Sequence, residues 1–165
     1  MSGLLSVVCL VSLFALPLRA EKANLLAAAG NSFLLTQQTQ FIGNNYNVAN
    51  WGLDRIDQRF RPLNGTYTYN NTGAGVNVYV FDNGINQFHQ EFEGRASLSY
   101  NPLNDGFLWS TCDGHGTHVA GIIGGKTFGV AKQATLHSIR VATCQWNGQQ
   151  LQPVVSDEAV VQALD

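Results

Sequence analysis

The sequence has few charged residues and no long run of charge or of apolar side chains. Only 12% of its 165 residues are charged, and no run of like charge exceeds two residues. Proteins that bind nucleic acids use clustered Lys and Arg to neutralise phosphates, so we expect no nucleic-acid partner. The apolar stretch 4–16 is shorter than the roughly 20 residues that a membrane span requires. The hydrophobic share of 45% is ordinary and predicts a folded chain.

Cysteine is also scarce. Only three occur and none forms a CxxC pair, which leaves a thiolate zinc site without support. Cys9 lies in the apolar N-terminal stretch, so Cys112 and Cys144 are the pair left beyond it. In an oxidising compartment they would form a disulfide bond, and the alternative is two separate buried thiols.

The first twenty residues have the pattern of a secretory signal. The stretch 4–16 ends at Pro17-Leu18-Arg19-Ala20, whose small last residue predicts cleavage after Ala20. The alternative is a buried N-terminal helix. We therefore expect a secreted protein with no membrane association once the signal is removed.

The rest of the chain divides into a lead-in and a globular part. Residues 21–50 are weakly organised, with a short helix expected at 25–29, and the globular part begins near Trp51. The pattern then predicts a buried strand at 76–81, a helix containing 119–123, a strand at 135–141 and a helix from 156 to 164. This order is typical of parallel β/α units. Because a parallel sheet needs helices on both faces, these elements look like the first part of a larger α/β domain.

Two of these elements have candidate catalytic residues at their ends. Asp82 follows the first strand, where ligands gather in parallel sheets, although a turn-forming Asp-Asn-Gly is the plainer interpretation. The run DGHGTHVAG (113–121) sets two histidines at a helix start, without the third ligand of a zinc peptidase. Glycines on both sides of His115 leave its imidazole exposed, and a carboxylate such as Asp82 could orient it as a general base. We expect His118 to make a structural hydrogen bond inside the fold, and His89 and His137 to be ordinary residues.

Five short motifs stand in order along the chain: WGLDRIDQR (51–59), VYVFDNGI (78–85), EFEGRA (91–96), HGTHVAG (115–121) and GVAK (129–132). Together they resemble the subtilisin-like serine peptidases, and among these the proteinase K and aqualysin branch. The resemblance implies the N-terminal part of a three-layer α/β domain with a parallel sheet. It also implies that Asp82 and His115 are the acid and base of an Asp-His-Ser triad, which needs no catalytic cofactor.

The resemblance has further implications for partners and structural sites. It implies a polypeptide substrate, a monomer, a disulfide between Cys112 and Cys144, and a non-catalytic His118. It also implies a structural calcium site with oxygen ligands, at Asp54, Asp57, Gln58, Asn64 and Thr66. The alternative for these residues is a solvated turn. A glycan on the Asn64-Gly65-Thr66 sequon would compete with the use of Asn64 as a calcium ligand.

The sequence also departs from the family pattern. Asn83 stands where the family has Thr or Ser, and its amide can replace their hydroxyl as a hydrogen-bonding group. The family's Gly-Thr-Ser-Met-Ala motif with its serine nucleophile does not occur, nor does the oxyanion-hole Asn, so we expect the 165 residues alone to be inactive. The main substrate-binding edge would lie beyond residue 165.

These observations predict three regions: a signal at 1–20, a lead-in or remnant pro-segment at 21–50, and the N-terminal part of a catalytic domain at 51–165. Residues 21–50 are too few for a folded pro-domain. We expect the sequence to be a portion of a longer secreted peptidase. The alternatives are a secreted, non-catalytic binding protein derived from the family and a product that does not fold.

Overall fold

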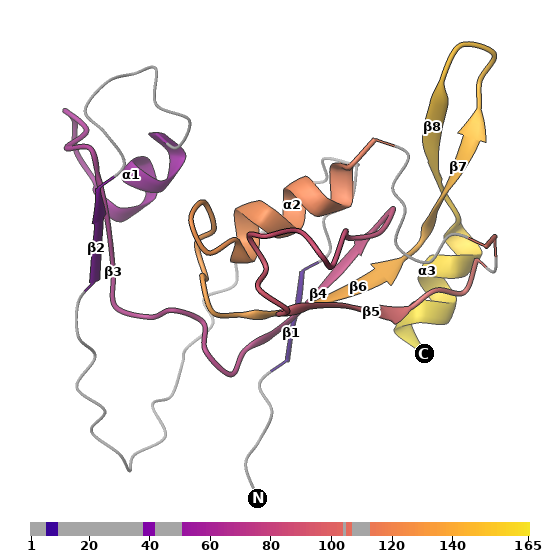
Figure 1. Ribbon diagram of the computed structural model, residues 1–165, viewed down its shortest axis with the longest axis horizontal. Coiled ribbons are helices and arrows are strands. Elements are labelled where there is room, and N and C mark those ends of the chain that lie inside the picture. Colours follow the sequence, from indigo (N-terminus) through magenta and orange to yellow (C-terminus); the bar gives the residue numbers. More distant parts are fainter. Residues whose placement is uncertain (1–5, 10–37, 42–50, 104, 107–112) are drawn as a thin grey trace, which may run out of the picture.

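The computed structural model describes residues 6–9, 38–41, 51–103, 105–106 and 113–165. At its centre is a four-stranded, wholly parallel sheet in the order β1-β4-β6-β5 (Figure 1). These strands are β1 (Ser6–Cys9), β4 (Asn77–Asp82), β6 (Thr135–Arg140) and β5 (Ala96–Tyr100). Two antiparallel pairs accompany the sheet: β2 (Gln38–Phe41) with β3 (Thr66–Tyr69), and β7 (Ala142–Trp146) with β8 (Leu151–Val155). The helices are α1 (Trp51–Asp57), α2 (His115–Gly124) and α3 (Asp157–Leu164).

Strand β4 shows why the fold has three layers. Alternate side chains of a strand point to opposite faces of its sheet. Val78 and Val80 pack in one cluster with Ala120 of α2, whereas Phe81 packs in a second cluster with Ala159 of α3. The two helices therefore cover opposite faces of the sheet, which confirms the expected α/β class.

Helix α3 begins where the sequence predicts. Ser156 precedes it, and the Ser156 Oγ accepts a hydrogen bond of 3.2 Å from the Ala159 N–H. Asp157 and Glu158 follow in the first turn, where negative charge favours the helix dipole. A capping serine and two acids thus set this end of the helix.

Lys132 ties the α1–β3 part of the chain to the loop that follows α2. Its Nζ donates hydrogen bonds of 2.9 Å to the carbonyls of Thr127 and Gly129. It also lies 5.6 and 5.8 Å from the ring centres of Tyr67 and Tyr69, within cation–π range. Burial lowers the pKa of Lys132. The Lys132 side chain therefore joins strand β3 to the loop that follows α2.

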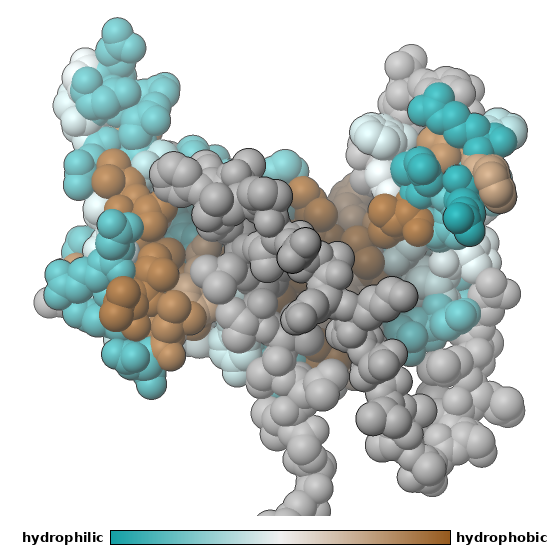
Figure 2. Space-filling model, turned by 180° about the vertical axis from the view of Figure 1, so that it is seen from behind, coloured by the Kyte–Doolittle hydropathy of each residue, from teal (hydrophilic) through white to brown (hydrophobic). Residues whose placement is uncertain are grey.

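The C-terminal side of the protein leaves large apolar side chains exposed. On α3 and the β7–β8 ribbon these are Trp146, Leu151, Val154, Val155, Val161 and Leu164. Seen from behind, apolar surface is visible on that side of the molecule (Figure 2). Exposed apolar surface of this kind is typical of a region that other protein covers.

The structure adds elements that the sequence patterns do not predict. Helix α1, strands β2, β3 and β5, and the β7–β8 ribbon are all additional. Ser6–Cys9 lie in the predicted signal segment and pair with β4, so a buried helix is wrong for these four residues. The helix expected at 25–29 lies outside the described residues. Within the described part of the chain, no helix has the length and apolar character to cross a membrane.

Candidate active site

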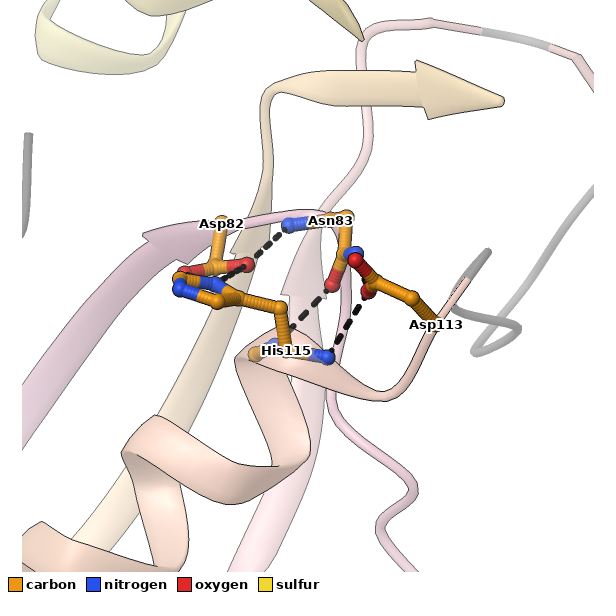
Figure 3. A network of polar contacts seen from close by, with 5 residues as sticks. Asp82, Asn83, Asp113 and His115 are labelled. Atoms are coloured by element: carbon orange, nitrogen blue, oxygen red, sulfur yellow. Dashed lines mark hydrogen bonds and ion pairs between the residues drawn. The ribbon is translucent and has the colours of Figure 1, made fainter. Parts of the chain in front are cut away.

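Asp82 and His115 meet at one edge of the sheet. Asp82 is the last residue of β4, at its carboxyl end, and His115 is the first residue of α2. The His115 Nδ1 lies 2.9 Å from both carboxylate oxygens of Asp82 (Figure 3). Asp82 is buried, whereas the His115 side chain is 38% exposed. The other ring nitrogen, Nε2, has no hydrogen-bond partner among the described residues, so it is the atom left to exchange a proton with a ligand.

Gly116 permits this close approach of helix and strand. A Cβ atom on Gly116 would lie 2.3 Å from the Gly84 carbonyl oxygen and 3.1 Å from the Asp82 Cβ. Any side chain would therefore force the start of α2 away from the end of β4. The glycine after His115 is thus required for the contact between His115 and Asp82.

The surroundings of His115 favour its protonated form. The hydrogen bond that His115 donates to Asp82 raises the pKa of His115, partial burial opposes that rise, and the charges of Asp82 and Asp113 add to it. An imidazole that is held by a carboxylate and has a raised pKa is a stronger base near neutral pH. The pair is therefore suited to accept a proton at Nε2 and to stabilise the imidazolium that results.

A second polar pair, Asn83 and Asp113, lies beside the first. The Asn83 amide donates from Nδ2 to the Asp113 Oδ1 at 2.8 Å and accepts at Oδ1 from the Gly116 N–H at 3.0 Å. The Asp113 Oδ1 also accepts from the His115 N–H at 2.9 Å, and this bond lowers the pKa of Asp113. Sequence reasoning did not single out Asp113, although an Asp just before a helix is a capping signal that could have found it.

Arg140 is a further residue that sequence reasoning missed. It ends β6, and its side chain is fully buried. Its Nε donates to the Asn83 carbonyl oxygen at 3.2 Å, and its two terminal nitrogens donate to the carboxylate of Asp105. Burial of a guanidinium requires such a partner. Arg140 therefore fixes the backbone that follows Asp82.

The other histidines differ from their expected environments. His118 is exposed, so the expectation that it lies inside the fold is wrong, and among the described residues its side chain makes no hydrogen bond. His137, expected to be ordinary, stacks on Tyr79 and contacts Ser99 and Asn77 through its two ring nitrogens. The helical turn after His115 points His118 outward, and periodicity alone does not reveal which side of α2 is covered.

Two hollows each include a residue of the segment that leads into α2. One of about 690 Å³ runs along α2, lined by Gly114, Thr117 and His118 together with Phe92 and Phe128. The other, of about 410 Å³, lies between Asp113 and the β7–β8 ribbon. Each hollow is thus lined by a residue next to His115 in the sequence or one position further away.

The predicted calcium residues lie together at the end of α1 and in the loop after it. Asp54 accepts from the N–H groups of Asn64 and Gly65 at 3.3 and 2.7 Å, and the Asn64 Oδ1 accepts from the Thr66 hydroxyl at 2.7 Å. The Gln58 side-chain amide donates hydrogen bonds to the carbonyls of Phe60 and Pro62.

The Asp57 carboxylate is the unusual member of this set. Its Oδ2 accepts from the Thr68 N–H at 2.6 Å, whereas its Oδ1 is buried and has no partner among the described residues. Across the described residues, no group of three or more His, Cys, Asp or Glu side chains is placed to hold a metal ion. An oxygen-only set is nevertheless what calcium prefers, and the unpartnered Oδ1 fits a cation.

Only one of the two cysteines of the predicted disulfide lies among the described residues. Cys144 lies in β7 and is disulfide-bonded. Cys112, the partner implied by the resemblance, lies outside the described residues. The pairing itself therefore stays a prediction.

Comparisons with known proteins agree on one family. A profile of the Subtilase family matches residues 73–163. The extracellular serine proteinase of Thermus sp. (strain Rt41A) is 53% identical over 117 residues, which are 71% of this chain and 27% of that protein. The alkaline serine exoprotease A of Vibrio alginolyticus is 49% identical over 104 residues, or 63% of this chain and 20% of that protein.

A solved structure gives the same result. The crystal structure of a cold adapted subtilisin-like serine proteinase matches with a TM-score of 0.62 and 43% identity, over 70% of this chain and 40% of that one. The chain spans about a quarter of the length of the curated relatives named above. With motifs, fold and relatives in agreement, the chain belongs to the subtilase family of serine peptidases.

Proposed function

We propose that this chain contributes the acid and base of the catalytic triad of a secreted serine endopeptidase, with Asp82 orienting His115. The observation that supports the proposal most is the 2.9 Å contact of the His115 Nδ1 with both oxygens of Asp82, at the carboxyl end of a parallel strand. Secretion is supported by the N-terminal signal pattern and by the name of the Thermus relative, an extracellular proteinase.

In this role each side chain has a distinct task. The Asp82 carboxylate accepts a hydrogen bond from the His115 Nδ1–H, and this leaves Nε2 as the basic atom. The His115 Nε2 takes the proton from a serine hydroxyl as that oxygen attacks the peptide carbonyl, and then delivers the proton to the leaving amine. Asp82 stabilises the imidazolium between these two steps.

The nucleophile is the part of the triad that this sequence does not identify. No Gly-Thr-Ser-Met-Ala motif occurs in the 165 residues, and no oxyanion-hole Asn is recognisable. We therefore propose that the 165-residue chain alone does not hydrolyse peptide bonds, because it has neither an acyl-enzyme nucleophile nor donors for the oxyanion.

The test is hydrolysis of fluorescently labelled casein by two proteins. One is the 165-residue chain, and the other is a chimera in which this chain replaces the matching part of the Thermus relative, which then supplies the remaining residues. We expect no hydrolysis by the chain and hydrolysis by the chimera. In the chimera, His115→Ala should reduce kcat by about 10⁶-fold and Asp82→Asn by about 10⁴-fold.

The matched control is His137→Gln in the same chimera. It alters a histidine that lies on the sheet away from Asp82, and it should retain activity. Full activity in the His115→Ala chimera would refute the assignment of the base. Hydrolysis by the 165-residue chain that disappears in His115→Ala would refute the proposal that the chain alone is inactive.

We also propose a structural calcium ion at the end of α1. Asp57 would bind it through the unpartnered Oδ1, with oxygens of Asp54, Gln58, Asn64 and Thr66 completing the set. The ion would neutralise buried carboxylates and hold the loop between α1 and β3. It would have no part in the chemical step.

A further inference from the structure

Asn83 is unusual because every one of its polar atoms has a partner in the site. The residue is 1% exposed. Its N–H donates to the Asp82 Oδ1 at 2.8 Å, and its carbonyl oxygen accepts from Arg140. Its amide group joins Asp113 to the Gly116 N–H, as seen in Figure 3. One side chain thus connects the end of β4 with the first turn of α2.

Asp113 completes this connection from the other side. The first N–H groups of any helix lack partners within the helix. Gly114, which precedes α2, provides no side-chain cap. Instead, the His115 N–H donates a hydrogen bond to the Asp113 side chain, and the Gly116 N–H donates one to the Asn83 side chain. The negative charge of Asp113 also lies at the end of the helix that favours it.

The consequence concerns the imidazole directly. His115 is the first residue of α2, and helix ends fray unless they are capped. The contact between Nδ1 and Asp82 joins residues 33 positions apart, so it depends on how firmly α2 is held against β4. A movement of about 1 Å at this turn would lengthen the bond beyond hydrogen-bond range.

We propose that Asn83 and Asp113 act together as positioning residues for His115. Asn83 links strand to helix through its amide, and Asp113 caps the helix and places a second negative charge near the imidazole. This inference rests on the proposed role of His115 as the base and adds the residues that regulate its geometry and basicity. In this arrangement the Asn83 amide is the hydrogen-bond donor and the Asp113 carboxylate is the acceptor.

The charges that face His115 define the expected pH effect. Asp82 faces it from β4 and Asp113 from the segment before α2, whereas Arg140 of β6 reaches Asn83 and is paired with Asp105. Both carboxylates favour the imidazolium. Loss of either the Asp113 charge or the Asn83 link should therefore lower the pH at which His115 titrates.

The experiment is an NMR titration of the His115 ring in the full 165-residue chain, together with hydrogen exchange of the backbone amides. Asp113→Asn removes the charge but keeps Oδ1, so His115 should titrate at lower pH while amide exchange stays unchanged. Asn83→Ala should also lower the titration pH, and it should speed exchange at Gly116 by roughly tenfold. The double variant should shift the titration by less than the sum of the two single shifts, because they share one hydrogen bond.

Ser138→Ala is the matched control for Asn83→Ala. Ser138 is buried on the neighbouring strand β6, and its hydroxyl has no partner among the described residues. This variant should leave both readouts unchanged. Faster exchange in Asn83→Ala with an unchanged His115 titration would mean that Asn83 has only a structural role, and additive shifts in the double variant would mean that the pair does not act together.

These readouts do not involve hydrolysis. Failure of the casein assay would refute the proposed endopeptidase and leave the titration result standing. Unchanged titration in both single variants would refute the positioning pair, whatever the chimera does.

Discussion

Two regions of this protein use aspartate in different ways. At the edge of the sheet, the two oxygens of Asp82 face the imidazole of His115. In α1, the two oxygens of Asp54 accept hydrogen bonds from the backbone N–H groups of Asn64 and Gly65 in the loop that follows. Both carboxylates are buried. The difference teaches that the partner, and not the residue type or its burial, decides whether a carboxylate acts on a titratable side chain or on the backbone N–H groups of a loop.

The two regions also differ in how far apart their partners lie along the chain. Asp54 is 10 and 11 residues from its partners, whereas Asp82 is 33 residues from His115. The loop is therefore a local structure, whereas the candidate active site needs β4 and α2 to pack together. Four changes test this contrast.

The largest effect on stability should come from Asp54→Ala. It leaves the N–H groups of Asn64 and Gly65 without their Asp54 acceptor, and each such loss costs about 1–3 kcal/mol, so we expect the free energy of unfolding to fall by about 2–6 kcal/mol. Urea unfolding in the presence of EDTA measures this. Glu93→Ala, which removes an exposed carboxylate, is the control and should change little. A loss below about 0.5 kcal/mol for Asp54→Ala would show that these hydrogen bonds do not hold the loop.

Calcium should produce the next largest effect. If the ion binds as proposed, a concentration 100 times its Kd adds about 2.7 kcal/mol of stability, and EDTA removes it. Asp57→Ala should abolish the response, because it removes the Oδ1 that would bind the ion. Asp157→Asn, at the exposed start of α3, should keep it. Thermal unfolding with and without calcium measures both, and no response in the unaltered chain would exclude the site.

Asp82→Asn should change how stability depends on pH. Because the pKa of His115 is raised on folding, its bond to Asp82 stabilises the fold below the ordinary pKa of about 6.5 and is lost as pH rises through the raised value. The stability difference between the unaltered chain and Asp82→Asn should thus be larger near about pH 5.5 than near about pH 8.5. Glu93→Gln should show no such pH dependence. An equal difference at both pH values would mean that Asp82 does not hold the imidazolium.

The smallest effect should come from Ser138→Ala. The hydroxyl is buried without a partner among the described residues, so its removal should be neutral or stabilise the fold by about 1 kcal/mol. This is the opposite of what we expect for Asn83, a buried polar residue whose atoms are all bonded. Clear destabilisation by Ser138→Ala in urea unfolding would reveal a partner for this hydroxyl.

Local patterns predicted several elements well. The apolar run at 76–81 and the segment 135–141 correspond to β4 and β6, and the capping serine at 156 marks the start of α3. Strand β5 (Ala96–Tyr100) was missed because two of its five residues are serines, which are weak strand signals. The β7–β8 ribbon had a usable signal, since Asn147-Gly148 lies between its strands.

The sequence by itself determined the chemistry that is available: the glycines around His115, the acid at the end of β4, and motifs specific enough to indicate the family. Only the tertiary structure decided which groups meet. It joined Asn83 to Asp113, buried Arg140 against Asp105 and left His118 exposed, and it gave one oxygen of Asp57 no partner within the described part of the chain. The reason is that periodicity describes one element at a time, whereas each of these contacts is set by how α2, β4 and β6 pack against one another or by how a loop closes.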